Sequence, residues 1–224
     1  MLIRRTLKAL LSGKAKGHFS QYGEDIVIHK LFPRSQKTGT YLDIGAFHPF
    51  YFSNTAYLWL KGWSGINVDA NPNSIKLFER VRPSDINIFG AVVASDIAKS
   101  QKVVPIFVPG NSIDPMGTCD AKTADDRGYS KALEVPAITV TSILERLSGR
   151  EIDFLNIDIE GLDEVVLSEI DFQTYLPKVI CVEDYADDIS AALASRITAK
   201  LLAAGYSMQF RLGPSSIFQL KAKT

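Results

Sequence analysis

Short apolar segments bounded by glycine alternate with helix-like segments along most of this 224-residue chain. The pattern of the first half predicts strand, helix, strand, helix, strand, with the strands at residues 40–44, 65–70 and 86–93. Strands that are buried on both faces and alternate with helices form βαβ units, and these build a parallel sheet. The alternation therefore predicts a single α/β domain, a class that often reaches this length.

The second half repeats the alternation and then ends in a different pattern. Strands are expected at residues 152–159 and 179–182, and one long helix is expected at residues 188–204. The last two apolar segments, Tyr206–Leu212 and Ser216–Leu220, are separated only by Gly213-Pro214 and its flanking residue. Strands joined so tightly must run antiparallel. We therefore expect a mostly parallel sheet with a C-terminal antiparallel hairpin.

The middle of the chain departs from this alternation. Residues 103–108 predict an additional strand, whereas residues 109–134 are polar, contain glycine and show no clear period. A long irregular segment inside a compact domain is usually functional, although a surface excursion without a role is the alternative. We expect residues 103–134 to form an insertion on the substrate side of the domain.

The N-terminal residues 1–19 differ from the domain at residues 20–224 because they are basic and amphipathic. The apolar residues of the first 17 positions recur at helical spacing, with lysine and arginine between them. The segment has neither the long apolar stretch nor the cleavage site of a signal peptide. We expect a short helix that either packs on the domain or makes weak contact with an anionic membrane surface.

Charge and cysteine content exclude several functions. Lysine plus arginine and aspartate plus glutamate each number 25, whereas a general nucleic-acid-binding protein would carry a basic excess. Cys119 and Cys181 are too few for a disulfide scaffold or a four-cysteine zinc site, and they fit a reducing compartment. No apolar run is long enough to span a bilayer. We expect a cytoplasmic protein without a nucleic-acid partner, with peripheral membrane contact through residues 1–17 as the open alternative.

The ends of the first two predicted strands carry a candidate binding site. In open parallel sheets, ligands bind beyond the carboxyl ends of the strands, where an acid after the second strand typically holds ribose hydroxyls. The turn after the first strand has one glycine, Gly45, followed by Pro49, which has no N–H donor. A pyrophosphate needs several glycines there, and the Asp43 carboxylate would repel it. The cofactor contacts expected on this basis are Asp43, Gly45, Ala46, Asp69, Ala70 and Asn71.

These electrostatics favour S-adenosylmethionine, which has a ribose, an ammonium and a sulfonium but no phosphate. They disfavour a nicotinamide-dependent oxidoreductase. Neither acid decides the question alone, because Asp43 could be a turn residue and Asp69 could form an Asx turn before Pro72.

The sequence also resembles the FkbM-type methyltransferases over most of residues 20–185. The segments that carry the resemblance are SQYGED, YLDIGAFHPFYFSNT, KGWSGINVDANP, FLNIDIEGLDEVVL and VICVE. The resemblance implies a class I Rossmann-like methyltransferase fold that uses S-adenosylmethionine, and many members modify hydroxyls of sugars or natural products. It also implies that Gly45 and Asp69 are the turn and ribose residues. The commoner turn of the family has a second glycine where this chain has His48 and Pro49.

Three residues are candidate bases for transfer to a hydroxyl, a weak nucleophile that gains from proton removal. His48 titrates near neutrality, with the alternative that it hydrogen-bonds the backbone of its turn. Asp158 is the strongest candidate, because a carboxylate in a central apolar strand needs a reason; it could instead orient the methionine part of the cofactor. Glu160 could be the base or a first-turn acid of the following helix.

A divalent metal is a further possibility at this rim. Asp158, Glu160, Glu183 and His48 could supply oxygen and nitrogen ligands. Because strand-end acids also occur without metals, the sequence favours a site with no metal. Taken with the resemblance to the FkbM-type family, which alone implies sugar or natural-product acceptors, the site leads us to expect an O-methyltransferase for a small or glycan acceptor in glycan or natural-product biosynthesis. A non-catalytic nucleotide- or glycan-binding module is the alternative.

Overall fold

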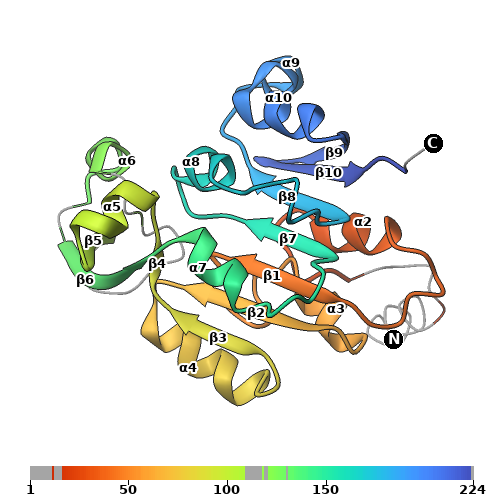
Figure 1. Ribbon diagram of the computed structural model, residues 1–224, viewed down its shortest axis with the longest axis horizontal. Coiled ribbons are helices and arrows are strands. Elements are labelled where there is room, and N and C mark those ends of the chain that lie inside the picture. The colour runs from red at the N-terminus through yellow and green to blue at the C-terminus, as the bar shows by residue number, and fades with distance from the viewer. Residues whose placement is uncertain (1–11, 13–16, 109–117, 119–120, 130, 223–224) are drawn as a thin grey trace, which may run out of the picture.

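A seven-stranded sheet forms the centre of the computed structural model, which describes residues 12, 17–108, 118, 121–129 and 131–222 (Figure 1). The spatial order is β3-β2-β1-β7-β8-β10-β9, and β10 is antiparallel to both of its neighbours. Numbered within this sheet alone, the order is 3-2-1-4-5-7-6, and strands one to five are parallel. This arrangement confirms the predicted class I methyltransferase fold with its C-terminal hairpin. The strands are β1 (Thr40–Ile44), β2 (Ser64–Asp69), β3 (Ile86–Phe89), β7 (Phe154–Ile157), β8 (Val179–Glu183), β9 (Tyr206–Leu212) and β10 (Ser215–Leu220).

Helices cover both faces of this sheet because successive residues of each strand point to opposite sides. Leu42 of β1 packs in a core with the helices α7, α8 and α10, whereas Tyr41 packs in a second core with α2 and α3. The helix α4 packs on β2 and β3. The bounds are α2 (Glu24–Lys30), α3 (Ala56–Leu60), α4 (Pro72–Val81), α7 (Val140–Glu145), α8 (Asp163–Ser168), α9 (Ile189–Ala194) and α10 (Arg196–Ala203).

The helix predicted at residues 188–204 is two helices, α9 and α10. Ser195 lies between them with φ −68° and ψ 158°, which is not a helical conformation. Its side chain accepts a hydrogen bond from the Thr198 backbone N–H and so caps the second helix. Ser195 therefore begins a new helix within the apolar pattern of residues 188–204. The prediction of one continuous helix there is wrong.

A second, three-stranded sheet has the order β4-β6-β5 and lies beyond the carboxyl ends of the central strands (Figure 1, left). Residues 86–93 form two strands, because the chain leaves the central sheet at Gly90, where a Cβ would lie 2.9 Å from Ile138. The irregular stretch expected at residues 109–134 is also partly wrong, since it contains a helix and the start of a strand. These elements are β4 (Ala91–Val92), α5 (Ser95–Ser100), β5 (Val103–Val108), α6 (Ala121–Asp126) and β6 (Lys131–Ile138).

The predicted amphipathic segment at residues 1–17 lies almost wholly outside the described residues, so its helix and its membrane contact stay predictions. Within the described part of the chain, no helix has the length and apolar character needed to cross a membrane. Cys119 also lies outside the described residues, whereas Cys181 is a buried free thiol in β8.

Candidate functional site

A cavity of about 340 Å³ lies at the carboxyl ends of β1, β2, β7 and β8, under the second sheet. Its volume is within the roughly 300–1,000 Å³ typical of small-molecule sites. Apolar side chains of β5 and β6 form one wall of the cavity, so part of residues 103–134 lies at this site. The described residues that line the cavity include Gly45, Asp69, Ala70, Asn71, Arg127, Asp158, Glu160, Glu183 and Tyr185.

The turn after β1 is held against both neighbouring strands. Gly45 has φ +83°, and a Cβ built there would lie 1.7 Å from the carbonyl oxygen of Asp158. The backbone N–H groups of Gly45 and Ala46 both donate to the Val68 carbonyl at 3.0 Å. Glycine is required here because any side chain would collide with the β7 backbone. Ala46 is buried and is not among the described residues that line the cavity.

Asp69 closes β2 and lines the cavity. Its two carboxylate oxygens accept hydrogen bonds from the Phe47 and Asn71 backbone N–H groups, each at 2.7 Å. Burial raises the pKa of Asp69 to about 6, although these hydrogen bonds oppose the shift. The carboxylate therefore fixes the turn geometry. A carboxylate has about four acceptor positions, so it can accept further bonds from a ligand.

Asn71 and Ala70 follow Asp69 along the cavity wall. The Asn71 side chain caps α4 by accepting hydrogen bonds from the Asn73 and Ser74 backbone N–H groups. The structure thus brings Gly45, Asp69, Ala70 and Asn71 together on one cavity wall, and their contacts with a cofactor stay a prediction.

Asp43 lies beneath the turn and is not among the described residues that line the cavity. Its carboxylate accepts hydrogen bonds from the Thr55 hydroxyl at 2.6 Å and the Asn156 amide at 2.9 Å. Burial raises the pKa of Asp43, and these hydrogen bonds and the Arg82 charge oppose the rise. The structure therefore gives Asp43 a supporting position under the turn, behind the described residues that line the cavity.

Arg82 is a fully buried cation that sequence reasoning missed. Its guanidinium donates to the Thr55 hydroxyl at 2.9 Å and to the carbonyl of Pro49. A charge-assisted hydrogen bond to a turn carbonyl fixes the turn firmly. Arg82 follows α4 in the sequence, and nothing in its local pattern indicates that it reaches the turn after β1.

His48 is not brought into the cavity, unlike the other two candidate bases. Its Nδ1 accepts hydrogen bonds from the Phe50 and Tyr51 backbone N–H groups, both at 3.0 Å, and its ring stacks on Tyr51. Burial, and to a smaller extent the Arg82 charge, lowers the pKa of His48. The geometry corresponds to the alternative considered above, a turn histidine that hydrogen-bonds the backbone.

Three carboxylates meet at the ends of β7 and β8. One carboxylate oxygen from each of Asp158, Glu160 and Glu183 lies within 4.8 Å of the others. Burial, and then the charges of Glu183 and its acidic neighbours, raises the pKa of Asp158 well above its usual value. Burial is also the largest cause that raises the pKa of Glu183, to about 7. Closely spaced carboxylates in a sheltered site hold protons more tightly than isolated ones.

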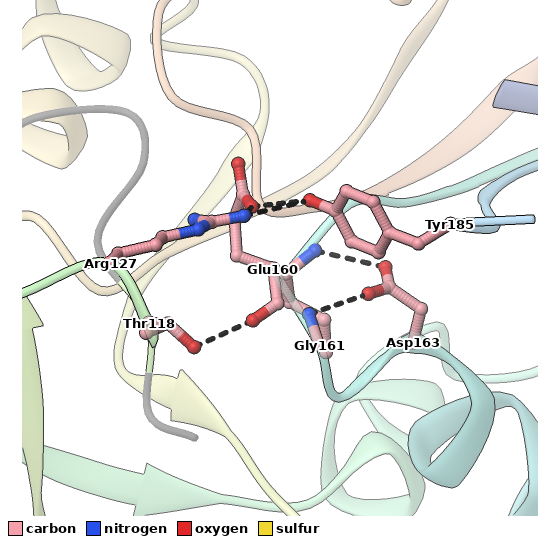
Figure 2. A network of polar contacts seen from close by, with 7 residues as sticks. Thr118, Arg127, Glu160, Gly161, Asp163 and Tyr185 are labelled. Atoms are coloured by element: carbon pink, nitrogen blue, oxygen red, sulfur yellow. Dashed lines mark hydrogen bonds and ion pairs between the residues drawn. The ribbon is translucent and has the colours of Figure 1, made fainter. Parts of the chain in front are cut away.

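Figure 2 shows how Glu160 is held. One of its carboxylate oxygens accepts hydrogen bonds from Arg127, at 2.6 Å, and from the Tyr185 hydroxyl. Its carbonyl accepts a hydrogen bond from the Thr118 hydroxyl at 2.6 Å. Glu160 has φ +53°, and the Asp163 carboxylate fixes the same turn by accepting from the Gly161 backbone N–H. Glu160 is thus held in place, and it is not a residue of the helix that follows.

Arg127 and Tyr185 line the cavity but were not anticipated from the sequence. Arg127 comes from the segment that has no period, so no pattern marks it. Tyr185 lies two residues after the end of β8, and the acids before it at the strand end were the only nearby signal. Both side chains reach Glu160 only in the folded chain, because Arg127 lies 33 positions before Glu160 and Tyr185 lies 25 positions after it.

The charged groups that line the cavity fit S-adenosylmethionine better than a dinucleotide. Four carboxylates line the described cavity wall, at Asp69, Asp158, Glu160 and Glu183, and the one guanidinium there is paired with Glu160. The hydroxyls of a ribose can donate hydrogen bonds to the Asp69 carboxylate, and the acidic rim attracts an ammonium or sulfonium. A pyrophosphate would meet repulsion from the same groups.

Comparison with known proteins gives one family. The family model of the methyltransferase FkbM domain matches residues 43–208. A TehB-like SAM-dependent methyltransferase from Corynebacterium glutamicum has a similar structure, with a TM-score of 0.42 and 14% identity over 98% of this chain and 96% of that chain. A comparison with curated proteins found no match. The family match covers the turn after β1, the end of β2 and the acidic rim, and the chain therefore belongs to the FkbM methyltransferase family.

Proposed function

We propose that this protein is an S-adenosylmethionine-dependent O-methyltransferase that acts on a sugar or another small hydroxylated acceptor. The observation that carries the proposal is the single cavity wall that holds both Asp69 and the acidic rim, with Gly45 between them. S-adenosylmethionine, when bound, supplies an activated methyl group for in-line transfer. The chain must then bind the cofactor, align the acceptor and accept a proton.

Each task has residues placed for it. Asp69 accepts hydrogen bonds from the ribose hydroxyls, and the backbone at Gly45 allows the cofactor to approach closely. Asp158 accepts the proton of the acceptor hydroxyl, and its raised pKa makes it a stronger base than an ordinary carboxylate. The apolar side chains of Ile106, Val108 and Leu133 shield the reaction from water.

A non-catalytic binding module is the second candidate. Such a module needs Asp69 and Gly45 but gains nothing from crowding Asp158 and Glu183 against each other, which costs folding free energy. The acidic rim therefore favours catalysis. We propose that the acceptor is a small molecule or glycan met in the cytoplasm and not a nucleic acid, because the sequence has no basic excess.

The position of the new methyl group tests the acceptor class. The protein is incubated with methyl-¹³C-labelled S-adenosylmethionine and pools of sugars, amines and carboxylic acids, and the products are examined by NMR. We expect a methyl ether and the demethylated cofactor. A product methylated on nitrogen or a methyl ester would contradict O-methylation of a hydroxyl.

Cofactor affinity should depend on pH through Asp69, whose pKa is about 6. The ionised carboxylate accepts ribose hydrogen bonds, so affinity should be highest above pH 6 and fall by up to about tenfold per pH unit below it. Asp43 is the charged neighbour that contributes to the shift. In Asp69→Asn, we expect about 10- to 100-fold weaker binding at pH 8, because a charged hydrogen bond is lost.

Calorimetric titration from pH 5 to pH 8 measures this effect. Other acids of the cavity also titrate, so the informative quantity is the difference between the wild-type and Asp69→Asn profiles. Glu79→Gln, an exposed acid on α4, serves as the matched control and should leave the profile unchanged. If wild type and Asp69→Asn bind the cofactor with the same dependence on pH, Asp69 does not contact the cofactor.

A further inference from the structure

The end of β8 carries an orphaned buried carboxylate oxygen. Glu183 is 8% exposed, and its Oε2 has no hydrogen-bond partner among the described residues. Leaving a buried carboxylate oxygen without a partner costs free energy, and native structures usually satisfy such an atom with a protein group, an ordered water or an ion. Because Glu183 lines the cavity, the missing partner can come from the solvent side.

The neighbouring acids make this partner a cation. One oxygen each of Asp158, Glu160 and Glu183 lies within 4.8 Å of the others. Both hydrogen bonds that Figure 2 draws to the Glu160 carboxylate use Oε2, and no dashed line joins the other oxygen to the residues drawn. Each of the three acids can therefore offer one oxygen to a common centre. Among the described residues, Arg127 already offsets part of this negative charge through Glu160, and a divalent ion would offset the remainder more fully than one ammonium or a water molecule.

We propose that Asp158, Glu160 and Glu183 bind a divalent cation of the Mg²⁺ or Mn²⁺ type. The donors are all carboxylate oxygens, which hard cations prefer and soft metals do not. At about 2.1 Å per bond, two oxygens on one Mg²⁺ lie about 3.0–4.2 Å apart. The three oxygens lie within 4.8 Å of one another, so a pair at that limit would have to close by about 0.6–1.8 Å, which rotation of the carboxylate side chains can supply. Among described residues, His48 contributes no ligand, because its Nδ1 is used by the turn and it does not line the cavity.

Three protein ligands leave about three positions of an octahedral ion open. On the proposed function, on which this inference rests in part, these positions face the cavity and can be taken by water or by acceptor oxygens. The acceptor class is then narrowed to molecules with two neighbouring oxygens, such as adjacent hydroxyls of a sugar, because a pair can bind one ion together.

Manganese binding to the full chain without cofactor or acceptor tests the site directly. Free Mn²⁺ gives a strong electron paramagnetic resonance signal that is lost on binding, so titration yields a dissociation constant and a stoichiometry. We expect one ion per chain, and Glu183→Gln should weaken its binding at least about tenfold. Asp187→Asn removes one exposed carboxyl charge four residues away and should change affinity less than twofold.

The experiment separates the site from folding and from the proposed function. Circular dichroism melts show whether Glu183→Gln is folded, and if it is not, Glu160→Gln, at a partly exposed residue, should show the same loss. No binding at millimolar Mn²⁺, or equal binding by wild type and a folded rim variant, would overturn the metal site. Methyl transfer that continues in excess EDTA would overturn its role but leave the methyltransferase intact.

Discussion

Replacing Gly45 with alanine should cost about 3–5 kcal/mol of folding free energy, the upper end for single substitutions. Two causes add. The residue has φ +83°, where a side chain is strained, and the new Cβ would lie 1.7 Å from the Asp158 carbonyl oxygen. Because that oxygen belongs to the backbone at the end of β7, rotation of a side chain cannot relieve the collision. The melting temperature should fall by about 10 °C or more.

Gly62→Ala is the matched control for this substitution. Gly62 has φ +93°, but a Cβ there meets nothing within 4 Å, so the change should cost only about 1 kcal/mol. Thermal melts followed by circular dichroism compare the two variants, and calorimetry should show that Gly45→Ala also loses cofactor affinity. Similar melting temperatures and undiminished cofactor binding would show that β1 and β7 do not approach as closely as described.

Asp158→Asn should lower the rate of methyl transfer by about 100-fold or more while the protein stays folded. Asparagine keeps the shape of the side chain but cannot take up the proton of the acceptor hydroxyl. Since burial and the neighbouring acids raise the pKa of Asp158, removing its charge should not destabilise the fold. Turnover is measured as release of the demethylated cofactor, with melting temperature recorded in parallel.

Two comparisons sharpen this prediction. Asp187→Asn makes the same change at an exposed position and should retain full turnover. Cofactor affinity should change much less than the turnover number in Asp158→Asn if the residue acts as the base. A selective loss of cofactor affinity would instead assign Asp158 to the methionine part of the cofactor, and unchanged turnover would exclude it from both roles.

The central sheet could be predicted from sequence because its strands are short apolar runs with clear ends. In β1, Thr40–Ile44 follows a glycine and precedes Gly45, so both limits are marked. Gly213 and Pro214 similarly mark the turn of the C-terminal hairpin. Such local signals fix strand positions, and the parallel order follows from the alternation with helices.

The second sheet was harder to predict because its strands carry mixed signals. The strand β5 was predicted at residues 103–108 although Pro105 argues against a strand, whereas β6, which contains Pro136, was not predicted. The strand β6 (KALEVPAI) also mixes charged, small and apolar residues without a strict alternation, and its partner β5 is 23 or more residues earlier in the chain. Pairing with β5 and β4 supplies the stability that the local sequence does not show.

The residues of the candidate site also fall into those that could be predicted from sequence and those that could not. Residues next to strand ends, such as Gly45, Asp69 and Asp158, could be placed because the topology brings those ends together. Side chains that reach the site over long distances, such as Arg82 and Arg127, have no local signal. His48 shows the opposite error, because its position in the turn was right but the direction of its side chain could not be read from sequence.

The most direct test of this account is calorimetric titration of the full chain with S-adenosylmethionine, its demethylated product and NAD under one set of conditions. An acidic cavity without phosphate-binding glycines predicts binding of both sulfur compounds at one site per chain and no measurable heat with NAD. Binding of NAD without either sulfur compound would contradict the account.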